Sequence, residues 1–223
     1  MENKALHFPT FSVDEFYEDP DAIRDFALSQ EFNNLGSRYP GRRTDGLEKI
    51  NPELFDMFCR KLFSIFYDFS VSTLDWNVTT SFQLIDKFDD PGKDQGWIHK
   101  DGHVIFAGII YLTPDARLES GTSIYREIEP VDDSLFKLKE KFFLEGEDTG
   151  YNKALKEHTS KFEETARFNN VYNRLVAFDG NVYHGVNSFD AGADKRLTQV
   201  FFINNLRTNS GTPVTRMAAQ ENN

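Results

Sequence analysis

The 223-residue sequence has a single cysteine, Cys59, and a shortage of positive charge. One cysteine cannot form an intramolecular disulfide, which excludes a secreted scaffold held together by disulfides. There are 25 Lys and Arg residues against 36 Asp and Glu residues, so the formal net charge is −11. An acidic surface repels phosphate backbones and anionic lipid, and we therefore expect neither nucleic acid nor a membrane as a partner. Cys59 itself is expected to be a small buried residue, not a reactive thiol.

Long apolar segments are also lacking. The longest run, Val104 to Leu112, is far shorter than the roughly 20 residues that span a bilayer. The first residues, MENKALHFPTF, lack the apolar segment of a signal peptide, and we expect a cytoplasmic protein. The run from Val104 to Leu112 predicts a strand that is buried on both faces.

Aromatic residues, in contrast, are plentiful. The 22 Phe and 8 Tyr residues supply large side chains, each of which buries roughly 150 Å² or more. That is enough for a hydrophobic core and excludes a disordered chain. We expect one domain over residues 1–223, since this length suits a single core.

Helices are predicted in the N-terminal third, where they would support a sheet over residues of about 14–70. Two segments share one start signal, an N-cap residue followed by proline, at Asp19-Pro20 and at Asn51-Pro52. Apolar side chains recur at helical spacing after both signals.

Strands are predicted at residues 5–13 and through most of the chain after Leu74. From Leu74 apolar and polar residues alternate, which is typical of a half-buried strand. Further strand-like pieces follow between turn signals such as Asp179-Gly180. They are WIHKD, HVIFAGIIYLT, GTSIYRE, NRLVAF, NVYHGVNSF and RLTQVFFINNL. The pattern indicates an antiparallel sandwich or barrel, interrupted at about 128–169 by a Lys- and Glu-rich segment that predicts a helical insertion.

Three residues in these strands have the chemistry of metal ligands. His99 and Asp101 are two positions apart, so on an extended chain their side chains point the same way. His184 follows the Asp179-Gly180 turn. Taken singly, each is more often an ordinary hydrogen-bonded residue than a metal ligand. Together they match the 2-His-1-carboxylate set of non-haem Fe(II) centres, which leaves three coordination positions open.

Arg196 adds a cation twelve residues after His184. Alternation places it on one face with Thr198, Val200 and Phe202. Burying a guanidinium without an anion is costly, so this face either opens to water or binds a carboxylate. A ligand that chelates a metal at one end and carries a carboxylate at the other has the chemistry of 2-oxoglutarate. A zinc site with two His and one acid is possible, but it does not explain Arg196.

In this order and spacing, the motifs resemble the Fe(II)- and 2-oxoglutarate-dependent oxygenases, and among them the prolyl 4-hydroxylase-like branch. The similar part runs from about Trp76 to Leu206. The motifs are His99-x-Asp101, IIYLT, ESGTSIY, LVAFDGNVYHGV and RLTQVFF. The resemblance implies a mainly β fold with flanking helices, namely a double-stranded β-helix, which is a cupin-like jelly roll.

The resemblance also implies a role for each motif residue. Iron would be held by His99, Asp101 and His184. Arg196 would pair with the far carboxylate of 2-oxoglutarate, Thr198 would touch that carboxylate, and Tyr111 would contact the same co-substrate. The implied activity consumes O2 and 2-oxoglutarate, hydroxylates a C–H bond of a peptidyl or small, amino-acid-like molecule, and releases succinate and CO2.

Two other classes of protein remain open from the sequence. One is a jelly-roll binding module that does not turn over, and the other is a zinc-dependent hydrolase of cupin-like architecture. His103 is expected next to the ligands or in the core, because a fourth protein ligand would occupy a position that the reaction needs. The Arg42-Arg43 pair is either a solvated loop or a flap that faces the substrate.

Overall fold

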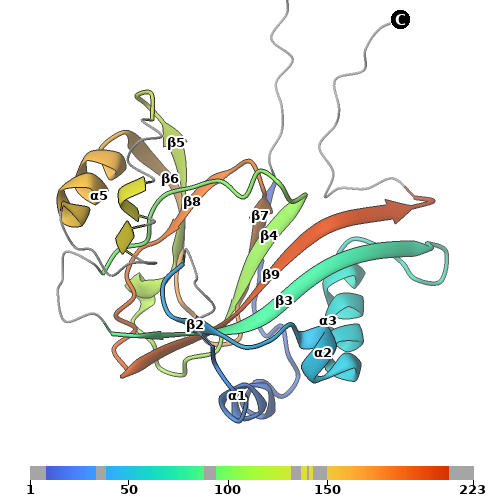
Figure 1. Ribbon diagram of the computed structural model, residues 1–223. Helices are drawn as coiled ribbons and strands as arrows, with labels where there is room; N and C mark the ends of the chain where they lie inside the picture. The colour runs from blue at the N-terminus through green and yellow to red at the C-terminus, as the bar shows by residue number, and fades with distance from the viewer. Residues whose placement is uncertain are drawn as a thin grey trace, which may run out of the picture.

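Two antiparallel sheets and a set of flanking helices make up the molecule (Figure 1). The structure, a computed structural model, describes residues 9–33, 39–87, 94–131, 137–139, 141–142 and 150–210. The larger sheet has the order β1 (Thr10–Val13), β7 (Leu175–Asp179), β4 (Phe106–Tyr111), β9 (Lys195–Thr208), β3 (Leu74–Asp86) and β2 (Arg42–Arg43). The smaller sheet has the order β6 (Phe162–Phe168), β5 (Thr122–Glu127) and β8 (Tyr183–Val186). The predicted jelly-roll architecture is confirmed.

The helices begin where the sequence predicts. In α1 (Pro20–Leu28), the Asp19 side chain accepts a hydrogen bond from the backbone N–H of Ala22. In α3 (Pro52–Ser64), the Asn51 side chain accepts one from Leu54. Each cap satisfies a backbone donor that the first helical turn leaves unpaired. Further helical elements in the described part of the chain include α2 (Leu47–Ile50), the 3₁₀ turn η2 (Leu118–Ser120) and α5 (Tyr151–Thr159).

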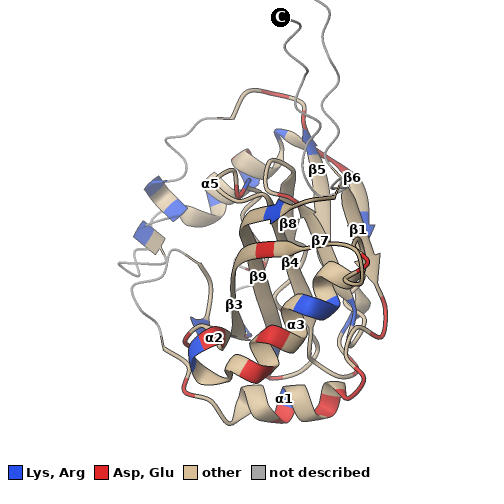
Figure 2. Ribbon diagram, turned by 90° about the vertical axis from the view of Figure 1, so that its right-hand side faces the viewer, with Lys and Arg blue, Asp and Glu red and all other residues tan. Residues whose placement is uncertain are grey.

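The larger sheet is buried on both faces because each face has a different partner. Figure 2 shows α3 in front of one face of this sheet, with α1 and α2 near the lower end of that face. On that face Phe201 of β9 packs edge-on against Phe58 of α3, with ring centroids 5.4 Å apart. The opposite face, which carries Val200 and Phe202, faces the smaller sheet and a cavity. The prediction that Val104 to Leu112 is buried on both faces is thereby explained and confirmed, apart from the partly exposed Ile105.

The polar face of β3 differs from the sequence prediction of a half-buried strand. Asp75 and Asn77 are exposed, but Gln83 and Ile85 are buried because this end of β3 lines the cavity. The polar residues of this strand therefore face an internal site at one end and solvent at the other.

The predicted helical insertion at about 128–169 is partly wrong. Helix α5 lies within it, but Phe162–Phe168 form strand β6, which pairs with β5. Most side chains of β6 are exposed, so its Glu- and Arg-containing sequence resembles a solvated helix. Pairing with β5, from Thr122 opposite Phe168 to Glu127 opposite Phe162, decides the conformation. Residues 132–136, 140 and 143–149 of the insertion, and residues 5–8 of the first predicted strand, lie outside the described residues.

Within the described ranges, no helix combines the length and the apolar character needed to cross a membrane.

Cys59 is buried in α3, as the sequence predicts, and burial raises the pKa of its thiol to about 12. We expect iodoacetamide at pH 8 to label the folded protein on the order of 100-fold more slowly than the protein unfolded in guanidinium chloride, because the reagent needs an accessible thiolate. Mass spectrometry of quenched samples measures both rates. Similar rates in the two states would contradict the burial of this thiol.

Candidate functional site

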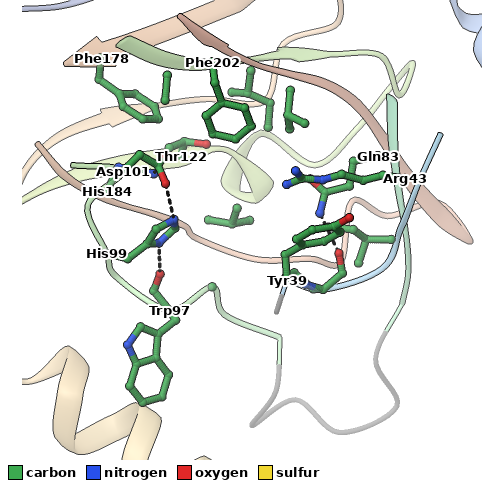
Figure 3. Close-up of a pocket in the computed structure, with 18 of the residues that line it drawn as sticks. Tyr39, Arg43, Gln83, Trp97, His99, Asp101, Thr122, Phe178, His184 and Phe202 are labelled. Carbon is green, nitrogen blue, oxygen red and sulfur yellow. Dashed lines mark hydrogen bonds and ion pairs between the residues drawn. The ribbon is translucent and has the colours of Figure 1, made fainter. Parts of the chain in front are cut away.

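A cavity of about 550 Å³ lies between the two sheets. Its walls come from β2, β3, β4, β7 and β9 of the larger sheet, from β5 and β8 of the smaller sheet, and from the segments around Tyr39 and around Trp97 and His99. Figure 3 shows these side chains converging from separate elements. The apolar part of the wall includes Ile85, Ile109, Phe178, Val186, Val200 and Phe202.

His99 and His184 face each other directly across an antiparallel bridge. The backbone N–H of each donates to the carbonyl of the other, with both N···O distances 3.0 Å. Residues opposite one another in such a pair project their side chains to the same side. The two imidazole rings therefore lie side by side, with centroids 4.4 Å apart.

Asp101 completes the cluster, as its i+2 spacing from His99 predicts. One carboxylate oxygen lies 3.7 Å from His99 Nε2 and the other lies 3.4 Å from His184 Nε2. The ligand atoms of the three residues all lie within 4.8 Å of one another. The backbone of Asp101 also lies close to Gly180, where a larger residue would not fit, since a Cβ there would lie 2.6 Å from the Asp101 carbonyl oxygen.

Backbone carbonyls orient both imidazoles. His99 Nδ1 lies 2.8 Å from the carbonyl oxygen of Trp97, and His184 Nδ1 lies 3.0 Å from that of Val182. A carbonyl can only accept, so Nδ1 carries the proton and the lone pair of each neutral ring is on Nε2. Two nitrogen lone pairs and a carboxylate then converge on one point, which is favourable when a cation lies between them.

The protonation states also suit metal binding. Burial and the neighbouring His184 lower the pKa of His99 below its usual 6.5. Burial would raise the pKa of Asp101, but contacts with the two histidines outweigh it and hold this pKa below 3.8. Near pH 7 the cluster therefore offers a neutral His99 and an ionised Asp101, the forms that bind metal ions.

Helix α5 supports the segment that carries His99. His158 donates from Nε2 to the carbonyl oxygen of Ile98, 2.6 Å away, and its ring stacks on Trp97 with centroids 4.4 Å apart. The sequence assigned His158 no role, because its partner is a backbone carbonyl that no motif marks. The insertion thus contributes to the position of a candidate ligand.

Arg196 lies at the base of the cavity and is 1% exposed. Its Nε donates to the Ser120 carbonyl oxygen at 3.3 Å, and its Cζ lies 5.7 Å from the centre of the Tyr111 ring. Its Nη2 is buried and has no hydrogen-bond partner among the described residues. Such an orphaned cationic donor fits an anionic ligand, as the sequence predicts for 2-oxoglutarate.

Thr198 and Tyr111 are neighbours of Arg196. The two residues pair across β9 and β4, and both are completely buried. Thr198 Oγ1 likewise lacks a hydrogen-bond partner in the described part of the chain. The Tyr111 hydroxyl instead donates to Thr122 Oγ1 at 3.0 Å. The structure therefore brings Thr198 to Arg196 with an unused hydroxyl, whereas the Tyr111 hydroxyl is already engaged.

Two expectations for other residues are revised. His103 lines the cavity but is exposed, so a place in the core is wrong. Arg43, which the sequence left open between a solvated loop and a flap, lines the cavity together with Tyr39 and Gln83. In Figure 3 these three lie across the cavity from His99.

Comparison with known proteins places this geometry in context. Residues 4–196 match the model of DUF6445, described as a family of unknown function. A search of curated protein sequences found no match.

Solved structures show where the fold occurs. HygX from Streptomyces hygroscopicus, solved with nickel and 2-oxoglutarate, is 12% identical, with a TM-score of 0.53 over 87% of this chain and 82% of that chain. A prolyl-4-hydroxylase from Pseudomonas putida is 13% identical, with a TM-score of 0.46 over 87% and 91%. At 12% identity, the likeness to HygX concerns the fold. The predicted resemblance to 2-oxoglutarate oxygenases is confirmed at that level.

The convergence of three ligand atoms on one point makes a direct prediction. We expect the protein to bind one equivalent of Co(II), and His184→Ala or Asp101→Ala to weaken binding by roughly 100-fold or more, because each removes a ligand. Isothermal titration calorimetry measures the affinity. His103→Ala is the matched control and should bind as the wild type does. Equal weakening in the control, or none in the ligand variants, would contradict this assignment.

Proposed function

The chain belongs to the DUF6445 family, and from the geometry of its site we propose that it is an Fe(II)- and 2-oxoglutarate-dependent dioxygenase. The observation that carries the proposal is the combination of a three-ligand cluster with an orphaned guanidinium in one cavity. Bound Fe(II) would supply positions at which 2-oxoglutarate and O2 react, giving succinate and CO2 while a substrate C–H becomes C–OH. The substrate we propose is a small molecule or a peptide.

In this proposal His99, Asp101 and His184 hold the iron and leave positions for co-substrate and O2. Their lone pairs already converge, so little reorganisation accompanies binding. The carbonyl oxygens of Trp97 and Val182 keep both imidazoles in the ligating tautomer.

Arg196 binds the far carboxylate of 2-oxoglutarate. The planar guanidinium is held by the Ser120 carbonyl and the Tyr111 ring, which leaves Nη2 for the ligand. Thr198 donates its hydroxyl to the same carboxylate. Tyr111 acts as a positioning residue for Arg196. Apolar side chains around the cavity exclude water from the reacting atoms.

The proposal differs in its chemistry from the two alternatives. The reaction of a zinc hydrolase does not require a buried guanidinium such as that of Arg196, which can bind a carboxylate. A binding module would retain ligand affinity without consuming O2. The zinc hydrolase therefore leaves Arg196 unexplained, and turnover separates the binding module from the oxygenase.

The test measures the binding of 2-oxoglutarate and its conversion to succinate. Anaerobic addition of Fe(II) and then 2-oxoglutarate should produce a visible metal-to-ligand charge-transfer band, and O2 should then yield succinate with a panel of amino acids and peptides. Arg196→Gln should weaken 2-oxoglutarate binding by about 100-fold, with a smaller loss in Arg196→Lys, because lysine keeps the charge but not the fork.

Arg207→Gln serves as the control for charge, since Arg207 is exposed at the far end of β9. Metal affinity should be unchanged in both Arg196 variants, and thermal melting checks their folding. A zinc-loaded protein with no band and no succinate would favour the hydrolase. A band without succinate across the panel would favour the binding module.

A further inference from the structure

Arg43 is a second cation in the cavity, and the proposed binding of iron and 2-oxoglutarate leaves it unused. It lies on β2, where Arg43 pairs with Gln83 and Arg42 pairs with Leu84. Neighbouring residues of a strand point to opposite faces, so one arginine faces inward and the other outward. Arg42 makes a surface ion pair with Asp86 at 3.2 Å, whereas Arg43 lines the cavity.

The turn before β2 brings this short strand close to β3. Gly41 has a φ of +77°, which favours glycine, and a Cβ there would lie 2.3 Å from the Leu84 carbonyl oxygen. Gly41 therefore allows β2 to pair closely with β3, and this pairing places Arg43 beside Gln83 in the cavity wall.

Arg43 has neutral neighbours. Its Cζ lies 3.7 Å from the centre of the Tyr39 ring, and its Nη2 donates to Gln83 Oε1 over a long 3.4 Å. Among the described residues, its Nε is buried without a hydrogen-bond partner and no carboxylate lies within ion-pair distance of the guanidinium. Asp101 is the acid that acts on it electrostatically, and a metal ion at the cluster would take up that charge.

The guanidinium is also held in place. Gln83 donates from Nε2 to the Pro40 carbonyl oxygen at 2.7 Å, which aims its Oε1 at Arg43. The Tyr39 ring supports one face of the planar group. A rigid, charged fork with an unused donor inside a largely apolar cavity is suited to binding a carboxylate in a defined orientation.

We propose that Arg43 binds the carboxylate of the substrate that is hydroxylated. This inference rests on the proposed function, because Arg196 is then occupied by 2-oxoglutarate. Phe178, Phe202 and Val186 line the same cavity, and in this proposal they contact the apolar body of that substrate. The substrate class is therefore a small carboxylic acid with an apolar body, or the free C-terminus of a peptide. An internal apolar residue of a peptide has no carboxylate to offer.

The test uses three probes with one apolar body: 3-phenylpropionate, its neutral amide 3-phenylpropionamide, and 2-phenylethyl phosphate. Calorimetry first measures 2-oxoglutarate binding to the Co(II)-loaded protein, and then titrates each probe with 2-oxoglutarate saturating. We expect the acid to bind at least tenfold more tightly than the amide. Arg43→Gln should abolish that preference, Arg43→Lys should keep part of it, and Arg42→Gln should leave it intact.

The outcomes separate the two proposals. Unchanged 2-oxoglutarate affinity in Arg43→Gln, together with loss of the acid preference, supports the assignment. An acid preference that survives Arg43→Gln, or that is missing in the wild type, overturns it, and a phosphate preferred by more than tenfold overturns the choice of carboxylate. If 2-oxoglutarate does not bind, the proposed function fails. In that case the three probes are titrated without 2-oxoglutarate into the Arg196→Gln variant and into the double variant Arg196→Gln/Arg43→Gln. An acid preference that is present in the first and lost in the second assigns the carboxylate to Arg43.

Discussion

The backbone pairing of His99 with His184 is the interaction on which the candidate site depends. Two hydrogen bonds of 3.0 Å set these residues opposite each other, so their side chains share one face and one height. A shift of register by one residue would turn His184 to the other face and disperse the cluster. Asp101 then needs only the i+2 spacing of an extended chain to reach both rings.

The rest of the fold holds that pair in position. Helix α5 binds the segment through the Ile98 carbonyl and the Trp97 ring, while β8 is held by β5. The larger sheet contributes its inner face to the cavity because its outer face is covered by helices. Within this sheet Gly108 of β4 pairs with Phe201 of β9, and only glycine fits beside that ring, since a Cβ on Gly108 would lie 2.3 Å from it.

Net charge and local charge have opposite signs in this protein. The chain as a whole carries −11, yet the two arginines that line the cavity in its described part are Arg43 and Arg196, each with a buried nitrogen that lacks a partner. The acidic composition describes the solvated surface, which disfavours polyanions. The cavity, where the dielectric is lower, is suited to small anions. Composition alone cannot report that difference, because it does not say which charges are buried.

The sequence by itself determined the residue types of the cluster, the helix starts at Asp19 and Asn51, and the alternation that places Arg196 and Thr198 on one face. These features are local, since they depend on caps, on strand period and on spacings of two residues. The tertiary structure alone decided that Phe162–Phe168 form a strand, that His158 supports Ile98, and that Arg43 faces inward while Arg42 does not. Each of these depends on pairing or packing between distant segments, and a local pattern carries no information about which partner a strand or side chain will meet.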